Sequence, residues 1–354
     1  MRVLIIRGTG GEKNNESGWF YHLALEGLSI SHTMFNHRDL VRKSVVFKIA
    51  QVSDYLFRKI QSHSLRNIPF IYKRADDRLL AAVVEFKPHL VLVTQAKTIT
   101  PALMDRIRRA IPDVIIVCHF QDNPFFYDPP FKTIPYYDHF FVKDTYVLNE
   151  VRKLGFKNVS YLPQACAPQV HRPVPDMTDA EREFYGSDLA FVGSMYPYRV
   201  RILEALKGYD FKIWGSGFHG DIPADSFVYS KHQRRWVVGR EKSMVFTASK
   251  ININTQNYQN DIFGVSSKVF QIAAAGGFQL MGYKPDLEKL FEIGSEIAVF
   301  HSRDELVELV DYYLERSEER QAMAQRARQR VLSEHTFVHR FCEIAERCGL
   351  SLSS

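Results

Sequence analysis

The sequence predicts an α/β fold built from two doubly wound, Rossmann-like halves, and three observations support this prediction. The chain has 354 residues, whereas single domains usually have ~100–200, so two domains are expected. In both halves, apolar segments rich in Val, Ile and Phe alternate with amphipathic helical patterns, which is typical of α/β folds. A proline-rich stretch at 166–178 separates the two halves.

The first half contains strands that read as buried on both faces. Its strand-like segments are RVLIIRG (2–8), HLVLVTQ (89–95), VIIVCHF (114–120), DHFFVKD (138–144) and VSYLPQ (159–164). Helical patterns lie between several of them, at RADDRLLAAVVEFK (74–87), TPALMDRIRRAI (100–111) and TYVLNEVRKLG (145–155). Continuous apolar strands joined by helices predict a parallel sheet with right-handed connections and helices on both faces.

The second half repeats this alternation. Its strand-like segments are DLAFVGS (188–194), DFKIWGSG (210–217), ININTQ (251–256), GFQLMG (277–282) and EIAVFHS (296–302). Helices are expected at REKSMVFTASK (240–250), at PDLEKLFEIG (285–294) and over most of 302–349. We therefore predict an N-terminal domain (1–165), a linker (166–178), a C-terminal domain (179–330) and a final helix (331–354) that packs back on the N-terminal domain. A cleft is expected between the two domains.

Composition indicates a soluble globular protein. Hydrophobic residues make up 45% and charged residues 24% of the chain. No segment has the ~20 apolar residues of a membrane span, and the start MRVLIIRGTGG lacks the pattern of a signal peptide, so we expect a cytoplasmic protein. Lys and Arg number 46 against 40 Asp and Glu, a net charge of +6 that favours anionic partners.

Ligands of open α/β sheets bind at the carboxyl ends of the strands, so the loops there hold the candidate site residues. After the first strand, Gly10 and Gly11 form a glycine-rich turn that can cradle phosphate or simply be flexible. The dinucleotide-binding fingerprint needs a further glycine where Lys13 stands, so a nicotinamide site is disfavoured.

In CHFQDNPFFYDPP, His119 and Asp122 fall where a strand gives way to a loop. The carboxylate can act as a general base, and the histidine can hydrogen-bond a sugar or a phosphate. The alternative is that Asp122 only caps the turn before Pro124.

Four loops of the second half supply the remaining candidates. Gly193, Ser194 and Arg199 follow the first strand of this half. Trp214 and Gly215 follow the second, where an aromatic ring can flank a nucleobase or be part of the core. Asn254 ends the third strand with an amide side chain.

The segment SSKVFQIAAAGG (266–277) has two interpretations. In the first, Ser266 and Ser267 cap a helix whose Lys268 is simply exposed. In the second, hydroxyls, free backbone N–H groups and the lysine together hold a pyrophosphate. The position of the segment, next to the expected cleft, favours the second interpretation.

These segments resemble the CgeB-like (spore maturation protein) branch of the group 1 glycosyltransferases, which have the GT-B fold. The resemblance lies mainly in DLAFVGSMYPYR, SSKVFQIAAAGGFQLMG, LEKLFEIGSEIAVFHSRDELVELVDYYL and RARQRVLSEHTFVHRF, with support from KPHLVLVTQAKTITPALMDRI, DNP and DHFFVKD in the first half. It implies transfer of a sugar from a nucleotide-sugar donor, such as a UDP-sugar, that is held mainly by the C-terminal domain. The acceptor hydroxyl would be held by the N-terminal domain.

The resemblance also implies roles for single residues. Lys268 and Arg199 would meet the diphosphate, and Asp122 or His119 would assist the acceptor hydroxyl. Two glutamates of the wider superfamily are replaced here by Phe263 and Gln271, although Gln271 can still bond a ribose hydroxyl. No Asp-x-Asp motif stands out, so we expect protein charges, and no metal or other cofactor, to stabilise the leaving diphosphate.

The acceptor is left open by the sequence. The basic amphipathic segment 41–61 packs on the sheet or lies on a membrane surface, in which case a lipid-linked glycan would be the acceptor. The basic run 231–242 is a solvated surface, adds positive potential near the nucleotide, or contacts nucleic acid, which is disfavoured because the charge excess is modest. Polysaccharide biosynthesis is the expected setting. The alternatives are a catalytically silent nucleotide-sugar- or glycan-binding protein, a DNA-base glycosyltransferase and a nucleotide-sugar epimerase.

Overall fold

The chain folds into two units. The computed structural model describes residues 1–7, 17–37, 40, 69–215, 217–218, 222–223 and 225–352, with the backbone alone at 69–71 and 129. One unit comprises Met1–Leu162 and Phe341–Ser354, and the other comprises Pro163–Arg340. The domain boundaries predicted from the sequence, at 165, 178 and 330, stay predictions.

The first unit contains a parallel sheet with the strand order β2-β1-β3-β4-β5-β6. The strands are β1 (Arg2–Arg7), β2 (Ser31–Asn36), β3 (Leu90–Val93), β4 (Ile115–Phe120), β5 (His139–Val142) and β6 (Val159–Tyr161). Every residue of β3 is buried, as expected for a strand covered on both faces, whereas the edge strand β2 is mostly half-buried.

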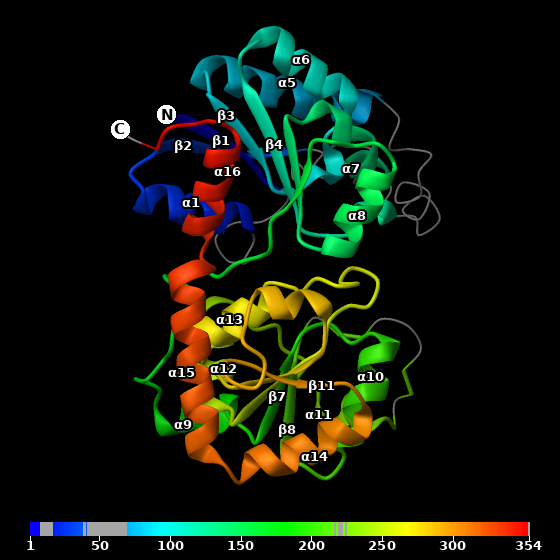
Figure 1. Ribbon diagram of the computed structural model, residues 1–354, viewed down its shortest axis with the longest axis vertical. Coiled ribbons are helices and arrows are strands. Elements are labelled where there is room, and N and C mark those ends of the chain that lie inside the picture. Colours follow the sequence, from blue (N-terminus) through cyan, green and yellow to red (C-terminus); the bar gives the residue numbers. More distant parts are fainter. Residues whose placement is uncertain are drawn as a thin grey trace. The chain divides into compact units, whose positions relative to one another are not determined.

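Helices connect these strands. They are α1 (Ser17–Gly27), α5 (Pro69–Phe86), α6 (Pro101–Ala110), α7 (Asp128–Thr133) and α8 (Thr145–Lys153), and α16 (Phe337–Arg347) extends into the same unit. Helices α5 and α6 lie side by side (Figure 1). The predicted cap of α6 is confirmed, because the Thr100 side chain accepts from the Leu103 N–H and Pro101 stands at the first helical position.

The second unit has its own parallel sheet, with the strand order β11-β10-β9-β7-β8. The strands are β7 (Leu189–Val192), β8 (Phe211–Trp214), β9 (Ile251–Asn254), β10 (Gln279–Gly282) and β11 (Ala298–Phe300). Side chains of β7, β8 and β9 fill a core that includes Phe191, Phe211 and Ile253. The carboxyl ends of these three neighbouring strands lie at one edge of the sheet.

The helices of this unit are α9 (Asp179–Tyr185), α10 (Pro197–Leu203), α11 (Phe227–Lys231), α12 (Gly239–Ala248), α13 (Lys268–Ala274), α14 (Arg303–Leu314) and α15 (Ser317–Glu334). Helix α13 is buried along its whole length and packs against α15 (Figure 1). The alanines of α13 allow this close approach because they add little bulk between the helices.

The α/β class and the strand-like segments predicted from the sequence are confirmed in both units. One predicted helix is wrong. At 285–294 the structure has only a 3₁₀ helix, Pro285–Lys289. The chain then turns at Gly294, whose φ is 83° and whose N–H donates to the Ile297 carbonyl. Within the described ranges, no helix is both long and apolar enough to cross a bilayer.

Candidate functional site

The carboxyl ends of β7 and β8 approach each other closely. The Gly193 N–H donates to the Trp214 carbonyl over 2.7 Å. A Cβ atom at Gly215 would overlap the Gly193 carbonyl group. Residue 215 must therefore be glycine if the two strand ends are to keep this spacing. Because Gly193 and Gly215 have no side chains, the backbone is uncovered at this part of the sheet edge.

Lys268 begins α13 and is buried at the same edge, with only 9% of its surface exposed. Its Nζ lies 4.5 Å from the centroid of the Phe191 ring, and a Cβ on Gly193 would lie 3.1 Å from that Nζ. No hydrogen-bond partner for Nζ exists among the described residues. Burial, followed by the charges of Arg199 and Lys242, holds the pKa of Lys268 well below its usual value. A cation placed in this way is costly unless an anion joins it.

Arg199 is the second buried cation, with 7% of its surface exposed. It lies in α10, and its guanidinium donates from Nη1 to the Ser194 carbonyl (2.8 Å) and from Nη2 to the Thr255 carbonyl (3.0 Å). These bonds tie together the loops that follow β7 and β9. Burial lowers the pKa of Arg199, while the nearby Asp261 carboxylate partly opposes this effect. The guanidinium is thus held by neutral carbonyl groups.

Lys242 is a third cation here. Its Nζ donates to Gln271 Oε1, while Gln271 Nε2 donates to Ser267 Oγ over 3.2 Å. Because an ammonium group can only donate, this contact fixes the orientation of the Gln271 amide. Burial lowers the pKa of Lys242 to about 8. Sequence reasoning did not assign Lys242 to the site, since only the fold brings it to Gln271.

The structure excludes the first interpretation of the segment 266–277, in which the serines cap a helix with an exposed lysine. Ser267 has helical dihedral angles and makes no capping hydrogen bond. The Ser266 N–H instead donates to Gln256 Oε1 (2.9 Å). The serines therefore do not cap α13, and Lys268 is not an exposed lysine.

Asn254 lies beneath this loop. It is fully buried, donates to Gln279 Oε1 over 3.2 Å and accepts from Gln256 Nε2 over 3.1 Å. Gln279 continues the chain by donating to the Val269 carbonyl over 3.0 Å. These amides hold the loop and the start of α13 in place. The structure thus gives Asn254 a supporting position and leaves its predicted contact with a nucleotide untested.

Trp214 lies in the apolar core of the second unit. It is fully buried and stacks on Tyr185, with ring centroids 5.5 Å apart and planes at 29°. Its ring therefore does not flank a ligand at the surface. The tryptophan that lines a pocket is Trp236, which is 60% exposed.

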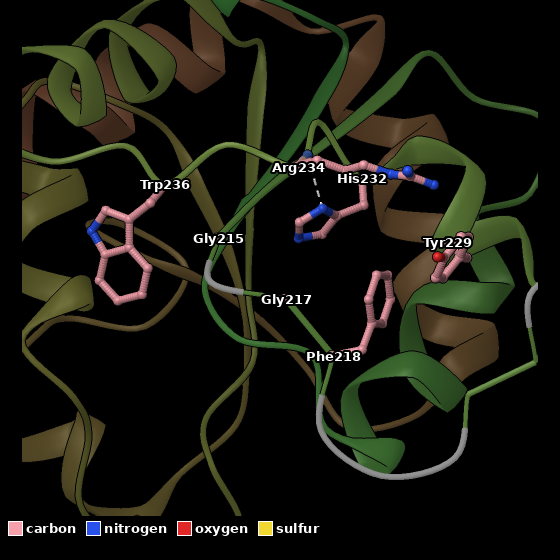
Figure 2. A pocket seen from close by; sticks show the side chains of 7 residues that line it. All are labelled: Gly215, Gly217, Phe218, Tyr229, His232, Arg234 and Trp236. Carbon is pink, nitrogen blue, oxygen red and sulfur yellow. Dashed lines mark hydrogen bonds between the residues drawn. The ribbon is translucent and has the colours of Figure 1, made fainter. Parts of the chain in front are cut away.

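The pocket next to Gly215 holds about 500 Å³ and is rich in rings (Figure 2). It is lined by Gly215, Gly217, Phe218, Tyr229, His232, Arg234 and Trp236. Phe218 stacks on Tyr229 at 4.8 Å and lies 5.0 Å from the His232 ring, centroid to centroid. Since Gly215 adjoins both the pocket and Gly193, the pocket and the Lys268 region share one sheet edge.

His232 supplies a hydrogen-bond donor within this pocket. Its Nδ1 accepts from the Arg234 N–H (2.9 Å; Figure 2), so the proton of the neutral ring is on Nε2. That Nε2 is buried, and no described residue accepts from it. Burial, and then the Arg234 charge, lowers the pKa of His232, which keeps the ring neutral. Arg234 itself has a left-handed backbone with φ of 52°, an unfavourable conformation for a non-glycine residue.

The two candidates in the first unit have different surroundings. His119 is fully buried; its Nε2–H donates to the Leu162 carbonyl (3.1 Å) and its Nδ1 accepts from the Tyr21 hydroxyl (2.7 Å). Asp122 has a 27% exposed side chain and pairs with Lys97 Nζ at 2.6 Å. Between the two, only Asp122 presents its functional group to solvent.

Several sequence predictions fall on residues outside the described ranges. Gly10 and Gly11 are among them, as is the amphipathic segment 41–61. The basic run 231–242 is largely described, and it is not uniformly solvated: His232, Arg234 and Trp236 line the pocket, and Lys242 contacts Gln271. In the part of the chain that the structure describes, no group of three His, Cys, Asp or Glu side chains is arranged to hold a metal ion.

The second half of the chain matches a known protein family. Residues 199–346 match the model of a family described as glycosyl transferase-like. Spore protein CgeB of Bacillus subtilis (strain 168) is 25% identical over 231 residues, which cover 60% of this chain and 68% of CgeB. The matched family region begins at Arg199 and includes Lys268, Gln271 and the ring-lined pocket.

Comparison with solved structures gives matches over almost the whole chain. A glycosyltransferase from Rickettsia africae ESF-5 superposes with a TM-score of 0.63 and 13% identity, covering 98% of each chain. Anabaena Alr3699/HepE, solved with UDP-glucose, gives a TM-score of 0.64 and 10% identity over 99% of each chain. Sucrose-phosphate synthase from Thermosynechococcus elongatus gives 0.66 and 10%, covering 98% of this chain and 99% of that one. The expected GT-B fold is therefore confirmed.

Proposed function

We propose that this chain is a CgeB-like glycosyltransferase that transfers a sugar from a nucleotide-sugar donor to an acceptor hydroxyl without a metal ion, a proposal supported by the family match, the similarity to CgeB and the GT-B fold. The observation that carries the proposal is the ammonium group of Lys268. It is buried beside Gly193 and has no hydrogen-bond partner among the residues that the structure describes. An anion of the ligand would supply the missing partner.

The charges at this edge suit a diphosphate. Three cations lie here: Lys268, Arg199 and Lys242. The Asp261 carboxylate interacts electrostatically with Lys268 and Arg199. A nucleoside diphosphate would offset this excess. Its charge grows as the bond to the sugar breaks, so the cations stabilise the transition state more than the bound donor. The same cations take the part that Mg²⁺ plays in metal-dependent transferases, which is the basis for proposing metal independence.

The ring-lined pocket is the proposed site of the nucleobase. Phe218 and Tyr229 offer aromatic surface, and His232 Nε2–H offers a donor for a base carbonyl. A pyrimidine dione such as uracil has carbonyl oxygens for this donor. UDP is accordingly the first nucleotide to test, which agrees with the UDP and UDP-glucose complexes of HepE.

Asp122 is the proposed general base. During transfer, the acceptor oxygen forms a bond to the anomeric carbon, the bond from that carbon to the diphosphate breaks, and the acceptor proton passes to the carboxylate. Lys97 Nζ pairs with the Asp122 carboxylate at 2.6 Å and orients it. His119 is a weaker candidate because both of its ring nitrogens are already bonded inside the fold.

A second candidate function is nucleotide-sugar binding without catalysis. It is favoured by Gln271, a neutral amide that accepts hydroxyl hydrogen bonds less strongly than a carboxylate would and whose oxygen already accepts from Lys242. Detection of sugar transfer or donor hydrolysis would exclude this candidate.

The test is a calorimetric screen of the full chain against UDP, GDP, ADP and their glucose conjugates, with and without EDTA. We expect one nucleoside diphosphate to bind, with EDTA having no effect. Lys268→Ala should weaken this binding at least about 100-fold, because a buried charge pair is lost. The exposed Lys289→Ala serves as the matched control. Normal binding by Lys268→Ala would refute the proposed site.

A further inference from the structure

Two tyrosines at the same sheet edge have no part in the proposed donor site. Tyr198 is 50% exposed and Tyr258 is 67% exposed, and their ring centroids are 5.6 Å apart with planes at 48°. Tyr198 lies in α10, after β7, and Tyr258 lies in the loop after β9. Because β7 and β9 are neighbouring strands, the two rings form a small aromatic surface, here called the tyrosine platform.

The platform adjoins the buried cations. Tyr198 precedes Arg199, whose Nη2 donates to Thr255 at the start of the loop that carries Tyr258. Asp261 closes this loop and interacts electrostatically with Arg199. The cations are more than nine-tenths buried at Arg199 and Lys268, whereas the tyrosines are half or more exposed. The platform is thus the outer rim of the proposed diphosphate site.

The loop that carries Tyr258 is braced, so the exposure of the ring is a fixed feature. The Asn257 N–H donates to Asp261 Oδ2 (3.1 Å), and the Asp261 N–H donates to the Asn257 carbonyl (2.8 Å). Lys284 Nζ donates to the Asp261 carbonyl (2.6 Å) and lies 5.2 Å from the Tyr258 ring centroid. A loop that is already braced loses little backbone entropy when its exposed aromatic ring binds a partner.

We infer that the tyrosine platform binds the acceptor, and that this acceptor is a saccharide whose pyranose ring stacks on Tyr258 and Tyr198. A pyranose has a face of C–H bonds, which packs on an aromatic ring, and a rim of hydroxyls, which the tyrosine hydroxyls can bond. The inference rests on the proposed function and narrows its acceptor to a glycan. Both rings are half or more exposed, so they are open to an acceptor that arrives from solvent.

The experiment measures glycan and nucleotide binding separately. Full-length wild-type protein, Tyr258→Ala and Tyr198→Ala are applied to an array of α- and β-linked gluco-, galacto- and manno-oligosaccharides, with and without UDP. The glycans retained are then titrated in solution. We expect the wild type to retain at least one glycan and Tyr258→Ala to bind it about tenfold more weakly, with an unchanged affinity for UDP.

Two control variants complete the test. Tyr258→Phe keeps the ring and should bind the glycan within about twofold of the wild type. Tyr312→Ala removes an exposed tyrosine of α14, 41% exposed, and should change nothing. Folding is checked by the UDP affinity of each variant.

Three results would overturn the inference. They are retention of no glycan by the wild type, equal retention by Tyr258→Ala, and a Tyr258→Ala variant that loses UDP or UDP-sugar affinity in parallel, which would place the tyrosines in the donor site. Glycan binding in a chain that binds no nucleotide would refute the proposed transferase but leave the saccharide site standing.

Discussion

The carboxyl edges of the two sheets differ in how their charged side chains are paired. In the second unit, Lys268 and Arg199 are buried among carbonyl groups, an aromatic ring and Lys242, and the carboxylate that interacts with them is Asp261. In the first unit, Lys97 pairs with Asp122, and His37 is held between Asp76 (2.7 Å) and Thr98 (2.9 Å). The second edge has more cations than carboxylates, whereas each of these two groups of the first edge has a carboxylate partner. This difference supports the proposal that the anionic donor binds the second unit and that a carboxylate of the first unit accepts the proton.

The largest expected effect comes from removing the Asp122 carboxylate at the sheet edge of the first unit. Asp122→Asn should lower kcat by about 10²–10⁴-fold, since the amide cannot accept the acceptor proton. Donor affinity, measured by calorimetry, should stay unchanged because the donor is assigned to the other unit. A variant that keeps its kcat would show that Asp122 is not the base.

The second expected effect is on the pH dependence of UDP binding, and it follows from the lowered pKa values of the buried lysines in the second unit. Lys242 has a pKa of about 8 and that of Lys268 is well below its usual value, so both lose protons as pH rises through the values of the free protein. Only the protonated lysines hold a diphosphate. UDP affinity should therefore fall above pH about 8, where Lys242 loses its proton, by up to about tenfold per pH unit.

Proton uptake provides a direct check on this pH dependence. Calorimetric titrations at pH 8 in buffers of different ionisation enthalpy should show protons entering the complex. Affinity that is constant between pH 7 and pH 10 would mean that the lysines do not meet the phosphates.

Replacing Lys242 tests its role in the charge excess. Lys242→Met should weaken UDP binding several-fold and raise the thermal midpoint at pH 7, because a desolvated charge is removed. In the wild type the folded state binds fewer protons than the unfolded state between pH about 8 and 10.5, so stability rises across that window. Lys242→Met should not show this rise of stability with pH. Lys250→Met, which removes an exposed lysine of the same region, is the control.

The smallest expected effect concerns Gly193. A methyl group at this position would lie 3.1 Å from Lys268 Nζ, on a backbone whose φ of 153° favours glycine. Gly193→Ala should therefore displace the ammonium slightly, lower the stability of the fold somewhat and weaken UDP binding a few-fold. Gly215→Ala, in contrast, should lower the yield of folded protein, because its Cβ would meet the backbone. Equal behaviour of the two variants would contradict the geometry described for the strand ends.

Much of the fold could be predicted because buried parallel strands are continuous apolar runs, as in β3 (LVLV). Strand β2 was missed because its sequence, SHTMFN, is mostly polar, which an edge strand tolerates. The helix predicted at 285–294 was wrong because its apolar residues are buried by a 3₁₀ turn and a reversal at Gly294.

The site could be predicted less completely. Lys268 and Arg199 were identified because polar residues that follow strands meet at one edge of a parallel sheet. Their burial depends on packing against Phe191 and could not be read from the chain. Lys242 and His232 lie in the basic run 231–242, which the sequence placed near the nucleotide only as one alternative, and neither was singled out because their roles depend on tertiary contacts with Gln271 and with Phe218. Trp214 and Trp236 could not be distinguished without knowing which of them faces the core.

The placement of the tryptophans allows ligand binding to be followed by intrinsic fluorescence. The chain has three of them; Trp214 is buried inside the second unit, Trp19 is partly covered in the first, and the exposed Trp236 lines the ring-lined pocket. A nucleobase that enters there should quench Trp236 emission and leave the blue-shifted signal of Trp214 intact. Occupancy can then be followed in real time on unlabelled protein.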